Sequence, residues 1–251
     1  MLKELTKAFK MFFLFLGLSI YIALLLIGFS SALPTGADVT FVATDNGPTV
    51  VPDNRSDLGG TITAITIDAQ QKDTAWKAYV GNVTGKFVLR NSNSMSIYEW
   101  PSSTSINGEV YITRSASVNF SNGRISCANN SVMVAEQTFF GMSGTATDNI
   151  NNTFNSTNHT GFLVGGNTIT QNTCPAIATW VNNTAQTPSP SAVFQEIALY
   201  DTSNFVYAAI INNDQTGFEN TTIYDFQAIV AENGSSSTTG TTYYFYVELG
   251  P

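Results

Sequence analysis

The chain has 251 residues, of which 43% are hydrophobic and only 11% charged, and its formal net charge is −8. This length suits one large domain or two small ones, but the charged fraction is less than half of the roughly 25% typical of soluble proteins. The acidic balance excludes nucleic acid as an expected partner, because phosphate backbones would be repelled.

The first 32 residues have the pattern of a targeting segment. Residues 1–10 carry three lysines, and residues 11–28 (MFFLFLGLSIYIALLLIG) carry no charge. Eighteen such residues are near the lower limit for crossing a bilayer and slightly long for a signal-peptide core. A cleaved signal peptide and a retained N-terminal hydrophobic helix that anchors the chain both remain open. Either one exports the chain from about residue 33, so we expect an extracellular or cell-surface location, with membrane contact only through residues 11–28 if they are uncleaved.

The sequence after the targeting segment predicts a series of short β-strands. Residues 33–59 are rich in Pro, Gly and Asp and predict an extended lead-in. Runs rich in β-branched and aromatic residues predict strands at 39–43, 60–68, 74–80, 86–89, 95–100 and 109–113. The polar run Asn91-Ser92-Asn93-Ser94 predicts a turn that pairs 86–89 with 95–100 as a hairpin, and Pro101 ends the second strand.

The middle of the chain, residues 115–191, has a different character and reads as an insertion. Asn130 or Ser131 is expected to cap a short helix, and a polar loop should follow at 147–160. Short apolar pieces at 161–164 and 176–180 precede a Pro/Ser connector at 186–191.

The two cysteines, Cys127 and Cys174, predict a disulfide within the insertion, because an exported chain with an even cysteine count favours one. Closing a loop of this length would stabilise the fold by about 4 kcal/mol in the chain-entropy model. Neither cysteine belongs to a CxxC or CxxCH motif, which excludes zinc, haem and thioredoxin-like sites.

The last sixty residues predict two further strand pairs, 192–200 with 204–211 and 223–230 with 242–249. Both faces of Tyr243-Tyr244-Phe245-Tyr246-Val247 are apolar or aromatic, so this strand should be covered on both sides or meet another subunit. Together the pattern predicts a mostly β fold. We expect an Ig-like or jelly-roll-type antiparallel β-sandwich over residues 60–251, with a disulfide-stapled loop and short-helix insertion.

Glycosylation sequons are about twice as frequent as chance would give. A surface covered with N-glycans is therefore expected in a host that makes them. The candidate acceptors are Asn54, Asn82, Asn119, Asn129, Asn151, Asn155, Asn158, Asn182, Asn220 and Asn233.

Two parts of the chain resemble a family of exported, mostly archaeal, cell-surface β-proteins. One is the run Trp76-Lys77-Ala78-Tyr79-Val80-Gly81-Asn82-Val83-Thr84-Gly85, followed by Tyr98-Glu99-Trp100. The other is Tyr224-Asp225-Phe226-Gln227 with the closing strand Tyr243–Leu249. The two cysteines also fall where such proteins carry a pair. The resemblance implies location and architecture, and it carries over no catalytic or binding residue.

The residues that could carry chemistry do not form a recognised catalytic or metal-binding pattern, so no enzymatic activity and no cofactor or metal is expected. His159, the single histidine, is expected to be an exposed loop residue. Ser143 lies in Gly141-Met142-Ser143-Gly144, which misses the nucleophile elbow by one position. Asp53 and Asp57 offer oxygen ligands for calcium, but Arg55 lies between them.

Two groups of side chains leave alternatives open. A pair of carboxylates for glycoside hydrolysis depends on distances that sequence does not give; the candidates are Glu99, Glu109, Glu196, Asp201, Asp225 and Glu248. Trp76, Trp100 and Trp180 are more typical of a core than of a sugar-binding platform.

Two functions follow from these observations. The first is an exported, glycosylated structural protein of the cell surface, a subunit of an extracellular assembly or filament in which residues 33–59 add a strand to a neighbour's sheet. The alternative is an extracellular module that binds carbohydrate or another ligand through exposed tryptophans. The expected partners are therefore further copies of the chain or envelope components.

Overall fold

The structure, a computed structural model, describes residues 33–47, 52–67, 69, 71–101, 106–233 and 240–250. The chain is mostly β and its strands pair antiparallel, as predicted. The targeting segment, for which an N-terminal hydrophobic helix is predicted, lies outside the described residues. Neither helix in the described part of the chain has the length and apolarity needed to cross a membrane.

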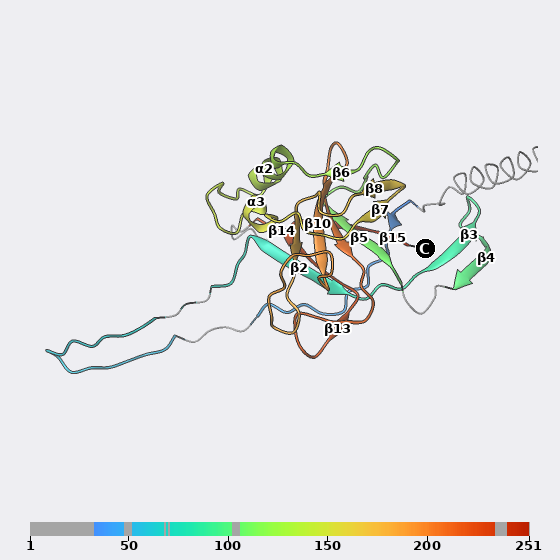
Figure 1. Ribbon diagram of the computed structural model, residues 1–251. Coiled ribbons are helices and arrows are strands. Elements are labelled where there is room, and N and C mark those ends of the chain that lie inside the picture. The colour runs from blue at the N-terminus through green and yellow to red at the C-terminus, as the bar shows by residue number, and fades with distance from the viewer. Residues whose placement is uncertain are drawn as a thin grey trace, which may run out of the picture.

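A seven-stranded antiparallel sheet forms the centre of the molecule (Figure 1). Its strands run in the order β1-β15-β5-β11-β10-β6, and β9 also pairs with β10. Their bounds are β1 (Thr35–Gly36), β5 (Gly108–Thr113), β6 (Ser126–Cys127), β9 (Ala176–Ala178), β10 (Gln195–Tyr200), β11 (Phe205–Ile210) and β15 (Tyr244–Leu249). The three central strands β5, β11 and β10 are buried along almost their whole length because both faces of the sheet are covered.

The predicted hairpin of the last sixty residues is confirmed as β10–β11, but the predicted final pair is wrong. The segment predicted at 223–230 forms β14 (Phe226–Ala231), which pairs with β2 (Trp76–Gly81). Strand β15 instead pairs with β5 on one edge and with β1 on the other. The long connection between β14 and β15 does not enforce a hairpin, and β15 has two apolar faces that are covered only inside the large sheet.

One face of the central sheet is covered by the β2–β14 ribbon and by two helices, α2 (Asn130–Phe139) and α3 (Ile150–Thr153) (Figure 1). Residues Ile112 and Tyr207 of the sheet pack here with Val230 of β14 and Phe154, which ends α3. The predicted helix is thus present as α2. Its N-cap is Asn129, whose side chain accepts a bond from the Val132 amide, and not Asn130 or Ser131.

The opposite face is covered by residues 115–125 and by the hairpin of β7 (Phe162–Val164) and β8 (Asn167–Ile169). Tyr111, Leu199 and Val206 of the sheet pack there against Phe120 and Phe162. The predicted disulfide between Cys127 and Cys174 is present. It joins β6 to the segment before β9, so the insertion is linked covalently at the edge of the sheet where both of these strands pair with β10.

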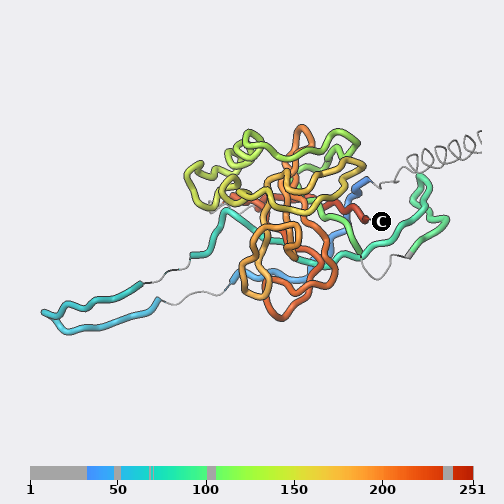
Figure 2. The backbone as a smooth tube through the Cα atoms, viewed as in Figure 1, coloured from blue at the N-terminus to red at the C-terminus, as the bar shows by residue number. Residues whose placement is uncertain are grey.

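Two predicted strands are not formed, and one hairpin stands apart. Residues 39–43 and 60–67 have β-branched sequences but lie in no strand of the described structure, because no neighbouring strand offers them hydrogen-bond partners. They belong to an arm, of which the structure describes residues 38–47, 52–67, 69, 71 and 72, and the part that begins at residue 52 leads away from the body (Figure 2). The predicted hairpin is present as β3 (Lys86–Arg90) and β4 (Ser96–Pro101), and a small pair, β12 (Gln215–Thr216) and β13 (Ile223–Tyr224), completes the fold.

The outer edge of β14 is satisfied by side chains of the central sheet. The amide of Ile229 donates to Oε2 of Glu196, and the amide of Ala231 donates to the Tyr207 hydroxyl at 3.3 Å. The carbonyl of Ala231 accepts a bond from the Tyr243 hydroxyl at 2.6 Å. Buried backbone groups need such partners, so these three side chains fix the ribbon on the sheet.

Replacing Tyr207 by phenylalanine tests this contact. Tyr207→Phe leaves the buried amide of Ala231 without a partner, so we expect the free energy of unfolding to fall by about 1–3 kcal/mol. The matched control is Tyr246→Phe, because the Tyr246 hydroxyl donates to the Ser115 carbonyl in a partly exposed place that water can reach. Urea denaturation of both variants measures the difference, and equal losses would contradict this role for Tyr207.

Candidate functional site

Two buried carboxyl groups lie directly opposite each other in the central sheet. Glu109 of β5 and Glu248 of β15 are paired residues of the ladder, and both are at least nine-tenths buried. The Tyr111 hydroxyl lies 3.3 Å from Oε2 of Glu109 and 3.2 Å from Oε2 of Glu248. The amide of Gly165, in the turn of the β7–β8 hairpin, donates to Oε2 of Glu248 at 2.9 Å.

The surroundings of Glu109 favour its protonated form. Burial, followed by the charge of Glu248, raises the pKa of Glu109 to about 8. Glycosidases require two nearby carboxyl groups whose pKa values differ, so that one is protonated while the other is ionised. Here the β7–β8 turn covers them, and a Cβ at Gly165 would lie 2.1 Å from the Phe120 carbonyl oxygen, so the site has no room for a substrate. The geometry supports a structural role.

The other acidic candidates lie apart from this pair and are engaged elsewhere. Glu196 faces β14, and its full burial raises the pKa of its carboxyl well above the usual value. Asp225 accepts bonds from the amides of Val83 and Asp214, and Asp201 accepts one from the amide of Asn119. Glu99 is exposed and forms an ion pair with Lys86.

His159 is buried, not exposed as predicted. Its Nε2 accepts hydrogen bonds from the amides of Thr173 and Cys174, at 3.1 and 2.9 Å, and Nδ1 therefore donates to the Thr160 carbonyl. Burial lowers the pKa of the ring, so the neutral form that these bonds need is favoured. The histidine fixes the chain beside the disulfide. The residues next to His159 in the sequence do not indicate this role, because the two amides that bind its ring come from another loop.

Ser143 and the two aspartates considered as calcium ligands, Asp53 and Asp57, are not part of a catalytic or metal-binding group among the described residues. The Ser143 hydroxyl contacts Thr145, not the histidine. Asp57 is bound by the Arg55 guanidinium at 2.9 Å, which neutralises the carboxylate that a cation would need. Within the described residues there is no group of three or more His, Cys, Asp or Glu side chains that could hold a metal ion.

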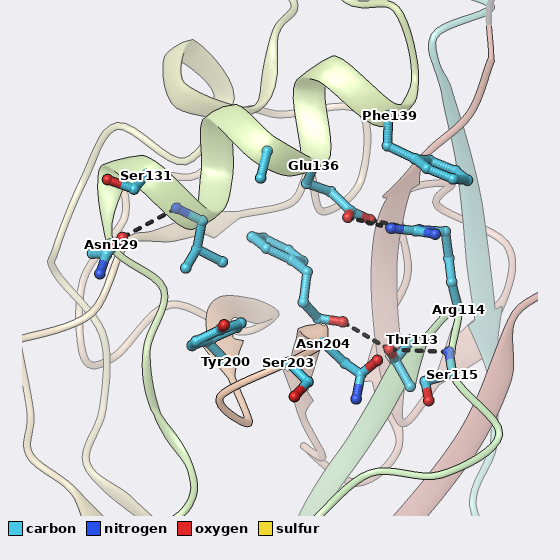
Figure 3. Close-up of a pocket in the computed structure, with 13 residues that line it drawn as sticks. Thr113, Arg114, Ser115, Asn129, Ser131, Glu136, Phe139, Tyr200, Ser203 and Asn204 are labelled. Atoms are coloured by element: carbon cyan, nitrogen blue, oxygen red, sulfur yellow. Dashed lines mark hydrogen bonds and ion pairs between the residues drawn. The ribbon is translucent and has the colours of Figure 1, made fainter.

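A cavity of about 720 Å³ lies between α2 and the turn that joins β10 to β11 (Figure 3). Figure 3 shows Arg114 at its side, with the guanidinium bound by both oxygens of Glu136 at 2.9 and 2.7 Å and stacked on the Phe139 ring at 3.6 Å. Since this cation is already paired, the cavity offers a ligand mainly neutral groups, such as the hydroxyls of Ser131 and Ser203 and the Tyr200 ring. No tryptophan lines it.

The tryptophans do not form one platform. Trp76 is half-buried in the core and its Nε1 donates to the Asp148 carbonyl at 2.6 Å. Trp100 lies on the β3–β4 hairpin and Trp180 follows β9, and both are about half exposed. The two exposed indoles are on separate elements.

Nine of the ten sequon asparagines are exposed, and Asn151 differs. Asn151 is half-buried at the start of α3, where its Nδ2 donates to Oδ1 of Asn130 at 3.0 Å. Its own Oδ1 is buried without a partner among the described atoms. The amide nitrogen to which a glycan would be attached is thus already engaged in the folded protein.

The arm and one strand edge are the features that fit an interaction site. Among the described residues of the arm, each large apolar side chain is at least 64% exposed; these are Val39, Phe41, Val42, Leu58, Ile62, Ile65 and Ile67. Lys72 donates to the Asn46 carbonyl, so the two limbs of the arm meet near its base. Strand β2 pairs with β14 on one edge only, and no described strand covers its other edge.

Comparisons of the chain with family models, with curated proteins and with solved structures find no match.

The acid pair makes stability depend on pH. Below about pH 4.5 Glu109 is protonated in both the folded and the unfolded chain. Between that pH and about 8 only the folded chain keeps the proton. Glu109 should therefore make stability fall with rising pH in this window, by roughly 1.4 kcal/mol per pH unit at most. Urea denaturation across the window should show a steeper fall in the wild type than in Glu109→Gln, which keeps only the contribution of Glu196, whose pKa burial also raises. The exposed control Glu99→Gln should keep the steeper fall, and parallel curves for wild type and Glu109→Gln would contradict the assignment.

The sequons give a second prediction, for protein made in a host that glycosylates Asn-x-Ser/Thr. Glycopeptide mass spectrometry should find a glycan on Asn82, which is exposed directly after β2, and none on Asn151. In matched variants, Asn82→Gln should remove one glycan from the intact mass, whereas Asn151→Gln should leave the glycan mass unchanged. An occupied Asn151 would show that its bond to Asn130 forms too late or too weakly to protect it.

Proposed function

We propose that the chain is an exported, glycosylated structural protein of the cell surface, and that copies assemble when the arm of one adds a strand to the open edge of β2 in the next. The observation that carries the proposal is the arm, an extended segment whose β-branched and aromatic side chains are exposed and whose backbone lies in no strand. Export itself rests on the targeting segment and on the sequons, and the disulfide is compatible with it.

The arm has the composition of a strand that lacks a partner. Its sequence Thr61-Ile62-Thr63-Ala64-Ile65-Thr66-Ile67 consists almost entirely of residues with high β propensity. Side chains of this kind in water are a liability unless another surface covers them. A neighbouring sheet edge would supply both the backbone partners and the apolar cover, as in other cases of strand addition.

The open edge of β2 has backbone groups that point outward. In an antiparallel pair, the residues opposite each other turn their hydrogen-bonding groups in opposite directions, either both toward the partner strand or both away from it. The amides of Ile229 and Ala231 point away from β2, toward Glu196 and Tyr207. Their partners in the ladder, Ala78 and Trp76, therefore direct their backbone groups away from β14. These are the groups that an added strand would bond.

The layered packing also supports the finer description of the fold. The β2–β14 ribbon packs over the central sheet, and Tyr79 meets Phe245 of β15 edge to face at 5.0 Å between ring centroids. We propose on this basis that the fold is an Ig-like or jelly-roll-type β-sandwich, and that the N-terminal segment acts as a signal peptide or anchor.

The alternative, an extracellular carbohydrate-binding module, has weaker support. It requires exposed tryptophans in an open cleft. Trp100 and Trp180 are exposed, but the cavity beside α2 contains neither of them.

Assembly through the arm is tested with two kinds of variant. The double variant Ile62→Asp/Ile65→Asp removes two apolar contacts, each contributing about 1.5–3 kcal/mol when buried, so association should weaken by at least about a hundredfold. Ala78→Pro removes one outward-facing amide of β2 without touching the bonds to β14, and should weaken association from the acceptor side. Sizing and electron microscopy of the purified native protein measure the assembled fraction.

The control is Val134→Asp, which places a charge on a partly exposed apolar residue of α2, away from both partners in the proposed contact. It should assemble like the wild type. A wild-type protein that remains monomeric at all concentrations, or arm variants that assemble normally, would overturn the proposal.

A further inference from the structure

The β3–β4 hairpin has an apolar face that nothing in the described structure covers. Phe87 is paired with Trp100 and Leu89 with Tyr98, so these four side chains share one face, called here the aromatic face. Each is between 41% and 59% exposed. The rings of Tyr98 and Trp100 pack edge to face at 4.9 Å. Lys86 and Glu99 form an ion pair on the other face of the hairpin.

A two-stranded hairpin of this kind is marginally stable in water by itself. Neither β3 nor β4 pairs with any other strand of the described chain. We therefore expect a binding partner to cover the aromatic face of the hairpin. The side chains of that face indicate which kind of partner fits. Tryptophan, tyrosine and phenylalanine on one side, with a charged pair on the other, is the composition of elements at a membrane–water interface.

The position of the hairpin agrees with this composition. A Cβ at Gly85, just before β3, would lie 2.5 Å from Cδ1 of Leu249, so the base of the hairpin lies at the C-terminal end of β15. Strand β1 runs antiparallel to β15 with Thr35 opposite Val247, which brings Leu33, two residues before Thr35, toward the same end. There it lies near Gly165, which is bonded to Glu248.

The chain enters the described structure at Leu33, and the uncharged run 11–28 ends five residues earlier in the sequence. The hairpin thus stands at the same end of the body as Leu33, the described residue closest in sequence to this run. Figure 1 shows β3–β4 projecting on the side of the body where β1 lies, while the arm leads away on the opposite side.

From these observations we infer that the aromatic face of β3–β4 binds a lipid surface and orients the exported protein with its arm directed away from the membrane. The inference rests on the proposed location at the cell envelope, but it does not require assembly through the arm. A zwitterionic surface is sufficient, because the contact is made by aromatic and aliphatic side chains and not by a basic patch.

The test is quenching of tryptophan fluorescence by phosphatidylcholine vesicles whose acyl chains carry bromine, using the exported protein with the N-terminus that the cell leaves on it. Wild type, Trp100→Phe and Trp180→Phe are compared, with non-brominated vesicles as the reference. Quenching should be present in the wild type, retained in Trp180→Phe and largely lost in Trp100→Phe. Equal quenching in the two tryptophan variants, or none in the wild type, overturns the inference.

A second pair of variants separates the hairpin from general surface effects. Leu89→Asp places a charge in the aromatic face and should reduce the quenching of Trp100, while Val134→Asp on α2 should not. If Trp100 emission instead shifts to the blue with protein concentration in the absence of lipid, the face binds a second copy and the inference is wrong. The arm variant Ile62→Asp/Ile65→Asp should keep wild-type quenching, so failure of assembly and failure of lipid binding are distinguished.

Discussion

The arrangement of the molecule depends on how the outer edge of β14 is satisfied. A two-stranded ribbon laid across a sheet has two edges of unpaired amides and carbonyls, and those that are buried need partners. Glu196 and Tyr207, with the hydroxyl of Tyr243, supply them from the sheet beneath and from the segment before β15. One edge of the ribbon is thereby closed by side chains, and the other, on β2, stays open. The same contact therefore stabilises the fold and leaves a single place on the ribbon where another strand fits.

The buried acids have the same physical role at two places. Glu196 and Glu248 each accept a hydrogen bond from a backbone amide that no strand reaches, Ile229 in one case and Gly165 in the other. A glutamate side chain is long enough to span the gap between two layers of backbone. Burial raises the pKa of Glu196, which favours the neutral form, and that form accepts the bond without placing an unpaired charge in the core. This explains why acidic residues occur in strands that are otherwise apolar, and it does so without catalysis.

Much of the local structure could be predicted from the sequence, because it depends on neighbours in the chain. The hairpins β3–β4 and β10–β11 follow from strand-forming runs on both sides of a short polar turn, and α2 follows from its cap and spacing. The pairings of β14 and β15 could not be predicted, because each strand has several apolar partners of equal quality and only the assembled layers decide among them. His159 and the Glu109–Glu248 pair were missed for a related reason. Their partners lie in distant segments, so no spacing in the sequence relates them. The open edge of β2 is visible only once β14 is placed.

The arm and the β3–β4 hairpin expose apolar side chains on a protein that carries few charged residues. With 7 basic and 17 acidic residues beyond residue 32, giving −10, most of the polar surface consists of Asn, Ser and Thr. Such a surface provides little electrostatic repulsion at close range, particularly in salt, so whichever apolar segments are exposed determine what the protein contacts. The arm is extended and its described backbone lies in no strand, which suits a sheet edge. The hairpin has its backbone paired internally, so only its side chains are available, which suits a surface without hydrogen-bonding edges, such as a bilayer. The difference in backbone pairing, more than the difference in composition, assigns the two elements to different partners.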